Sequence, residues 1–154
     1  LDKTVANENK QKLFSLDHSI RYVEGAELTL IATGGILRDT IQASELLKDH
    51  GIDTRVVSMY SIKPIDKDSI IAAVNETGGI VTIEEHNIDG GLGSAVAEVC
   101  MDNGFIPKKF LRIGINNQYS SIVGSQDYLK AHYQIDAIAI FKRVKILLGL
   151  ANKY

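Results

Sequence analysis

The sequence has no tryptophan and a single cysteine, Cys100, in 154 residues. One cysteine cannot form an internal disulfide, and its position within an apolar helical pattern predicts a small buried hydrophobe in a reducing compartment. The four histidines are far apart, and neither a Cys-x-x-Cys nor a His-x-x-x-His pair occurs. A metal site is therefore not predicted.

The chain also lacks an excess of charge of either sign. It has 17 Lys and Arg against 19 Asp and Glu, a formal net charge of -2, and its basic residues are scattered. This balance argues against a nucleic acid or an anionic membrane surface as a partner.

Long hydrophobic runs are missing as well. No apolar run approaches the ~20 residues that span a bilayer, and the start at Leu1 lacks the basic-then-apolar layout of a signal peptide. We therefore expect a cytoplasmic protein. Because the first residue is not methionine, we expect either a fragment of a longer protein or a chain whose extreme N-terminus is missing.

The length and a hydrophobic content of 45% fit one folded domain. Residues 1–24 are polar and predict a linker or arm from a preceding domain, and residues 25–154 predict one α/β domain. From Leu28 onward, short β-rich runs alternate with amphipathic helical windows, a pattern typical of a mainly parallel sheet. We predict three layers, with about five strands and helices on both faces.

The pattern predicts individual elements as follows. Strands are expected at residues 28–32, 54–59, 80–84 and 110–115, and helices between 36 and 51, at 67–77, before Gly104, at 125–133 and at 136–148. Asp66 is expected to accept hydrogen bonds from the free amides of the helix at 67–77.

The carboxyl ends of parallel strands form the crevice where ligands usually bind, so the segments that follow the strands are the candidate sites. Gly34 and Gly35 would let backbone amides approach an anion, and Arg38 would add positive charge. A tight turn that needs positive φ explains the same two glycines.

The segment Glu84–His86, with Glu85 and His86 as its candidate residues, is the second candidate, because a histidine beside carboxylates can act as a general acid or base near neutral pH. No serine or cysteine nucleophile lies beside them in the sequence. The alternative is a structural or interface role for His86.

The third candidate comprises Gly91, Gly93 and Ser94. Their segment resembles a dinucleotide fingerprint, but it lacks the third glycine and has no acid about twenty residues further on. A nicotinamide enzyme is therefore not predicted. Close packing of a helix against its strand or against a partner subunit explains these glycines, and all three residues remain candidates for an anion site or an interface.

Four segments carry a resemblance when the sequence is read in order: Glu24–Gly34, Lys63–Asp66, Thr82–Asn87 and Gly90–Glu98. Their most specific part is the Glu-Glu-His block followed by Gly-Gly-Leu-Gly-Ser-Ala. Together they resemble the C-terminal domain of the transketolase family, which includes deoxyxylulose-phosphate synthase and the β subunits of 2-oxoacid dehydrogenases, and the resemblance covers about residues 20–148.

The resemblance implies that the complete enzyme transfers two-carbon ketol units between sugar phosphates and uses thiamine diphosphate with Mg²⁺. In that family other domains hold the diphosphate and the aminopyrimidine ring, and their Gly-Asp-Gly motif is absent here. We therefore expect no cofactor bound by this domain alone, no activity of the isolated chain, and a complete enzyme that is a homodimer.

The partners implied are the diphosphate- and pyrimidine-binding N-terminal domains of the parent enzyme. The segment from Glu85 to Ser94 is expected at or near a domain or subunit interface. The alternative function is a stand-alone regulatory module that binds an anion or a nucleotide in the same crevice.

Overall fold

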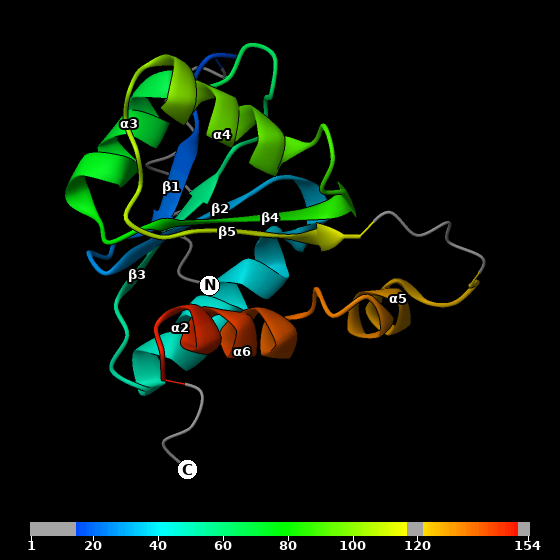
Figure 1. Ribbon diagram of the computed structural model, residues 1–154. Helices are drawn as coiled ribbons and strands as arrows, with labels where there is room; N and C mark the ends of the chain where they lie inside the picture. Colours follow the sequence, from blue (N-terminus) through cyan, green and yellow to red (C-terminus); the bar gives the residue numbers. More distant parts are fainter. Residues whose placement is uncertain (1–14, 117–121, 151–154) are drawn as a thin grey trace.

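A computed structural model of the chain describes residues 15–116 and 122–150 (Figure 1). Within these residues, five strands form one sheet in the order β1-β3-β2-β4-β5. All neighbouring strands are parallel except β1, which pairs antiparallel with β3. The predicted α/β class with a mainly parallel sheet is confirmed. The strands are β1 (Ile20–Val23), β2 (Leu28–Ala32), β3 (Thr54–Ser58), β4 (Ile80–Asn87) and β5 (Phe110–Ile115).

Two pairs of helices cover the two faces of the sheet (Figure 1). On one face lie α2 (Leu37–Asp49) and α6 (Ala137–Leu147), and on the other lie α3 (Lys67–Glu76) and α4 (Leu92–Asp102). A 3-10 turn, η2 (Gly34–Ile36), precedes α2, and α5 (Gln126–His132) lies beyond the end of the sheet. This is the predicted three-layer arrangement.

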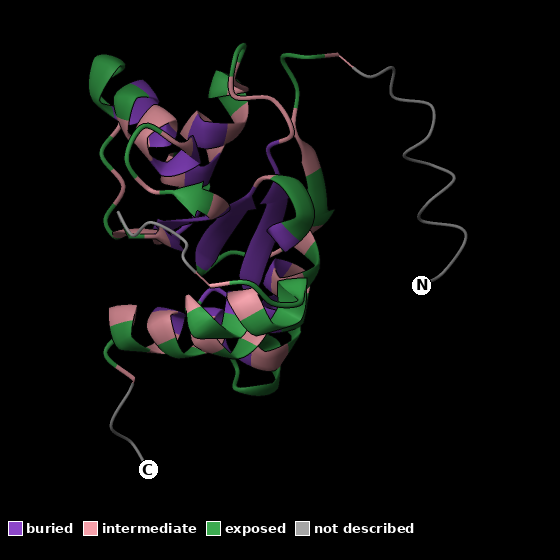
Figure 2. Ribbon diagram, turned by 90° about the vertical axis from the view of Figure 1, so that its right-hand side faces the viewer, coloured by how far each residue is buried: buried purple, intermediate pink, exposed green. Residues whose placement is uncertain are grey.

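Alternation along the strands supplies both halves of the core. In β2, Leu30 packs in the cluster with Ile140 and Val144 of α6, whereas its neighbour Ile31 packs in the other cluster with Ile70 of α3. Successive side chains of a strand point to opposite faces, so a strand covered on both sides is apolar throughout. Figure 2 shows these buried strands between the two helical layers.

The helix ends follow the local sequence signals. The side chain of Asp66 accepts a hydrogen bond from the Ser69 amide at 2.9 Å, as predicted for the cap of α3. Asp136 caps α6 in the same way, through the amide of Ala139 at 2.9 Å. Gly51, with φ of +76°, follows the end of α2.

The first strand lies in the segment that the sequence predicts to be an arm. β1 has two half-buried residues at its ends and two exposed residues between them, and it pairs with β3. The ordered domain therefore begins before residue 25. Residues 1–14 of the predicted arm lie outside the described residues.

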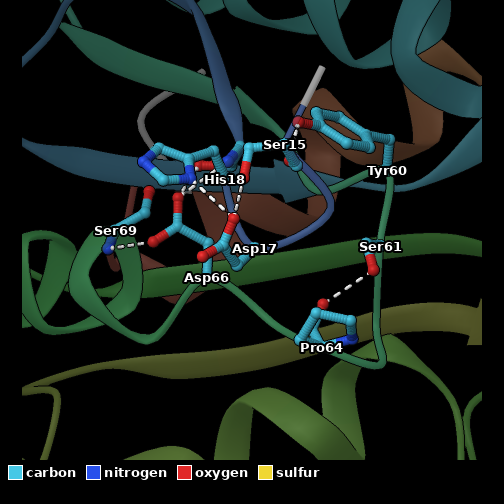
Figure 3. A network of polar contacts seen from close by, with 9 residues as sticks. Ser15, Asp17, His18, Tyr60, Ser61, Pro64, Asp66 and Ser69 are labelled. Carbon is cyan, nitrogen blue, oxygen red and sulfur yellow. Dashed lines mark hydrogen bonds and ion pairs between the residues drawn. The ribbon is translucent and has the colours of Figure 1, made fainter. Parts of the chain in front are cut away.

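A polar network fixes the chain just before β1 (Figure 3). The amide and hydroxyl of Ser19 donate to Oδ2 of Asp66 at 2.7 and 2.8 Å, and the hydroxyl of Tyr60 donates to the carbonyl of Ser15 at 2.7 Å. Asp66 thus caps α3 with one carboxylate oxygen and holds the entering chain with the other.

The fourth strand is longer than predicted. Pairing with β5 shifts register between Ile83 and Asn87 and then resumes at Asn87 and Ile115, so Glu85 and His86 belong to β4 and not to the loop after it.

Among the helices of the described residues, none combines the length and the hydropathy that a membrane span requires.

Candidate functional site

The candidate residues from the sequence lie at the carboxyl end of β2 and β4, which are adjacent and parallel. This adjacency brings Gly35 to Glu85. A Cβ atom on Gly35 would lie 3.0 Å from Oε2 of Glu85, and one on Gly34 would lie 4.0 Å from the same oxygen. Gly34 also has φ of +75°, so the turn explanation holds for this residue.

The buried side chain of Glu84 bonds the free backbone amides at the N-terminus of α4. Its side chain is 1% exposed, and its two oxygens accept hydrogen bonds from the amides of Leu92 at 2.9 Å and Gly93 at 3.0 Å. The free amides of a helix N-terminus attract anions. Here the anion is the protein's own carboxylate, which occupies the place that an external phosphate would need.

The glycines of the Gly-rich segment allow this close approach. A Cβ on Gly91 would lie 1.9 Å from Oε2 of Glu84, and one on Gly93 would lie 2.6 Å from Oγ1 of Thr82. Real Cβ atoms do not approach other atoms this closely. The packing explanation for these two glycines therefore fits the geometry.

Ser94 has internal partners too. Its hydroxyl donates to the carbonyl of Ile88 at 3.1 Å and accepts from the amide of Gly90 at 3.1 Å and from Nη1 of Arg112 at 3.2 Å. These bonds hold the loop between β4 and α4 against β5. Ser94 is thus a loop anchor within the domain.

Glu85 joins an ion-pair cluster on the opposite face from Glu84. Nζ of Lys130, from α5, lies 2.8 Å from Oδ2 of Asp39 and 3.3 Å from Oε1 of Glu85. The amide nitrogen of Gln126 lies 3.4 Å from the same Glu85 oxygen. The cluster ties α5 to the end of β4 and to the first turn of α2.

The Lys130 side chain is 9% exposed. Burial lowers the pKa of this amine, but the hydrogen bonds and charges of Asp39 and Glu85 outweigh burial and raise its pKa above the ordinary lysine value. Lys130 is therefore a cation that stabilises two partly buried carboxylates.

His86 and Arg38 do not join this cluster. Both residues are exposed, and neither side chain forms a hydrogen bond or an ion pair with any described residue. Among the described residues Glu85 pairs with Lys130 and not with His86. A general acid–base role for these residues stays a prediction. In residues 15–116 and 122–150, no group of three metal-ligating side chains occurs.

A cavity of about 250 Å³ adjoins the cluster. Glu85, Gln126 and Lys130 supply its polar side, and aliphatic and aromatic side chains supply the remainder. The apolar lining residues are Ile115, Leu129, Tyr133 and Ile135.

The sequence did not single out Asp39, Gln126 or Lys130, and it did not predict that Glu84 caps α4. Only Glu84 carried a usable signal, because a carboxylate in an otherwise apolar strand needs a hydrogen-bonding partner inside the fold. The others meet only through the tertiary structure.

Comparisons with known proteins show the family of this chain. The family model described as "Transketolase, C-terminal domain" matches residues 18–140. The chain belongs to the transketolase C-terminal domain family. The resemblance seen in the sequence is thus confirmed, and the match begins close to β1, before residue 25.

Curated relatives of this transketolase C-terminal domain include two proteins that are each more than twice as long as the region they share with it. The chain is 40% identical to a putative transketolase C-terminal section of Methanocaldococcus jannaschii, over 93% of this chain and 44% of that protein. It is 38% identical to one subunit of an apulose-4-phosphate transketolase of Phocaeicola vulgatus, over 88% of this chain and 42% of that protein. The chain thus spans less than half the length of these relatives.

A solved structure described as a split gene transketolase, an inactive beta4 tetramer, has the same fold. Its TM-score is 0.80 at 33% identity, and the alignment covers 90% of this chain and 45% of that chain. The arrangement of helices around the parallel sheet is therefore that of a transketolase C-terminal domain.

Proposed function

We propose that this chain is the C-terminal part of a thiamine-diphosphate-dependent, transketolase-type transferase, and that it supports assembly of the enzyme without binding the cofactor. The family match over residues 18–140 supports this proposal, together with relatives more than twice as long as the aligned region. The partners would be the diphosphate- and pyrimidine-binding parts of the parent enzyme, in a cytoplasmic homodimer of the complete enzyme.

Thiamine diphosphate does not fit the described residues at the sheet crevice. A diphosphate needs free amides or cationic side chains. The amides of Leu92 and Gly93 donate to Glu84, and the carboxylate of Glu85 lies against Gly35. The geometry likewise disfavours the alternative of a stand-alone anion- or nucleotide-binding module.

The observation that carries the assembly role is that Glu84 and Glu85 bond to groups within the domain, whereas other residues in these segments are exposed. His86 is exposed next to Glu85, and Val123 is 98% exposed in the segment that leads to α5. Surfaces that meet another domain combine apolar and polar side chains that are exposed in the separate domain.

Reconstitution tests the proposal. The chain would be combined with the remaining part of its parent enzyme, and both complex formation and ketol transfer would be measured. Wild-type chain should form a complex that is active only when both parts are present. The double variant Glu85→Ala, His86→Ala should weaken the complex, whereas Glu45→Ala, at an exposed position of α2, should not.

Two results would count against this function. Ketol transfer by the purified chain alone would show that it contains the catalytic machinery. Calorimetric binding of a nucleotide or sugar phosphate in the micromolar range, with no association between the two parts, would favour the regulatory module.

A further inference from the structure

The cavity beside Glu85 combines apolar walls with one incompletely compensated carboxylate. Leu129, Tyr133 and Ile135 line it, and it holds about 250 Å³, enough for one long side chain. The Glu85 side chain is 22% exposed, so it is accessible from outside the domain. This combination suits a group that has both an aliphatic stem and a charged head.

The charges of the cluster do not cancel. Asp39 and Glu85 contribute two negative charges, and Lys130 contributes one positive charge. The ammonium group of Lys130 is closest to Asp39, at 2.8 Å, and is 3.3 Å from Glu85. A net negative charge therefore remains, and most of it lies on Glu85.

The second oxygen of Glu85 has no donor among the described residues. Gln126 and Lys130 both approach Oε1, at 3.4 and 3.3 Å, whereas Oε2 faces Gly34 and Gly35 and accepts no hydrogen bond in the described part of the chain. Arg38, on the first turn of α2, is exposed and forms no ion pair with the described acidic residues. A carboxylate with free acceptor capacity is a site for a further cation.

We propose that this cavity receives one arginine or lysine side chain from the rest of the parent enzyme, with the stem on Leu129 and Tyr133 and the cationic head on Glu85. This inference rests on the proposed function and names the chemistry of the partner contact. An anionic group is disfavoured at the same place, because it would meet the net negative charge of the cluster.

A small probe tests the cavity in the 154-residue chain itself. N-acetyl-arginine amide would be titrated into isotope-labelled protein and followed by NMR. N-acetyl-citrulline amide, which has nearly the same shape without the charge, would serve as the matched probe. We expect saturable shifts of the Leu129, Lys130 and Tyr133 amides with the arginine probe, and binding about tenfold weaker with the citrulline probe.

Variants separate the charge from the walls. Glu85→Gln should reduce arginine binding to the level of the citrulline probe. Leu129→Ser should weaken both probes, because it removes part of the apolar wall. Glu45→Gln, on the exposed surface of α2, should bind as the wild type does, and the dispersion of the amide spectrum would verify the fold of each variant.

Several outcomes would overturn the inference. These are equal binding of the two probes, arginine binding that Glu85→Gln leaves unchanged, no saturable shift up to about 50 mM probe, and stronger shifts of the same amides with inorganic phosphate. If the reconstituted enzyme assembles but resists both Glu85→Gln and excess arginine probe, the occupant is not part of that enzyme. Failure of wild-type assembly would instead refute the proposed function.

Discussion

Replacing Gly91 by alanine should displace the carboxylate that caps α4. Gly91 has φ of -90° and ψ of -155°, which any residue can adopt, so the substitution causes no backbone strain. The new methyl group would lie 1.9 Å from Oε2 of Glu84, 2.7 Å from its Cδ and 2.9 Å from the carbonyl oxygen of Asn87. The Glu84 side chain cannot remain where it is.

The magnitude follows from the two hydrogen bonds that Glu84 would lose. A hydrogen bond to a charged group contributes roughly 1.5–3 kcal/mol. Partial relaxation would preserve some of this, so we expect the free energy of unfolding to fall by about 3 kcal/mol. For a domain of this size that corresponds to a decrease of roughly 6–12 °C in the melting temperature.

Gly90→Ala is the matched control. Gly90 has φ of +78°, but no atom lies within 4 Å of the position that a Cβ would take there. This variant measures backbone strain alone, which costs roughly 1–2 kcal/mol. Urea and thermal unfolding followed by circular dichroism would compare the two variants. If Gly91→Ala is no more destabilised than Gly90→Ala, the reasoning about the Glu84 cap is refuted.

Three further predictions concern single side chains. Lys130→Met should lower the free energy of unfolding by about 3 kcal/mol, because it leaves two partly buried carboxylates without their cation. Since folding raises the pKa of Lys130, its contribution to stability is present below the ordinary lysine value of 10.5 and is lost as the pH rises through the folded value. The stability difference between wild type and variant should therefore shrink in alkaline solution, as measured from urea midpoints across that pH range. Asp66→Ala should cost about 1–2 kcal/mol through loss of the α3 cap and of the contacts with Ser19, whereas Asp68→Ala, an exposed acid in the same first turn, should cost less than about 0.5 kcal/mol in the same assay. Cys100 is 3% exposed and burial raises the pKa of its thiol, so it should react with a thiol reagent at neutral pH only after urea is added, and rapid modification of the native chain would contradict its burial.

The fold was predictable because its signals are local. The continuous apolar run at Leu28–Ala32 and the capping position of Asp66 both depend on neighbours within a few residues, and both occur as predicted. The boundary at residue 24 was less well predicted, because the short edge strand β1 is only half-buried and lacks a strong apolar pattern. Its place in the sheet depends on β3, a strand that is distant in the sequence.

The candidate site was predictable only in part. Parallel pairing of β2 with β4 brings Gly35 to Glu85, and the rule for the ends of parallel strands anticipates this meeting. The partner of Glu85 could not be foreseen, because Lys130 lies on a short helix whose position depends on the tertiary fold. The strand was also expected to end at Glu84, whereas β4 continues through Glu85 and His86 to Asn87.

The internal carboxylate of Glu84 also bears on what this domain needs in order to fold. In a domain whose helix N-terminus binds a phosphate ligand, binding of that ligand adds to the free energy of unfolding. In this domain Glu84 of β4 already bonds the amides at the start of α4, so this helix terminus needs no bound ligand to neutralise it. A domain with this property can fold before it meets any other protein part or ligand.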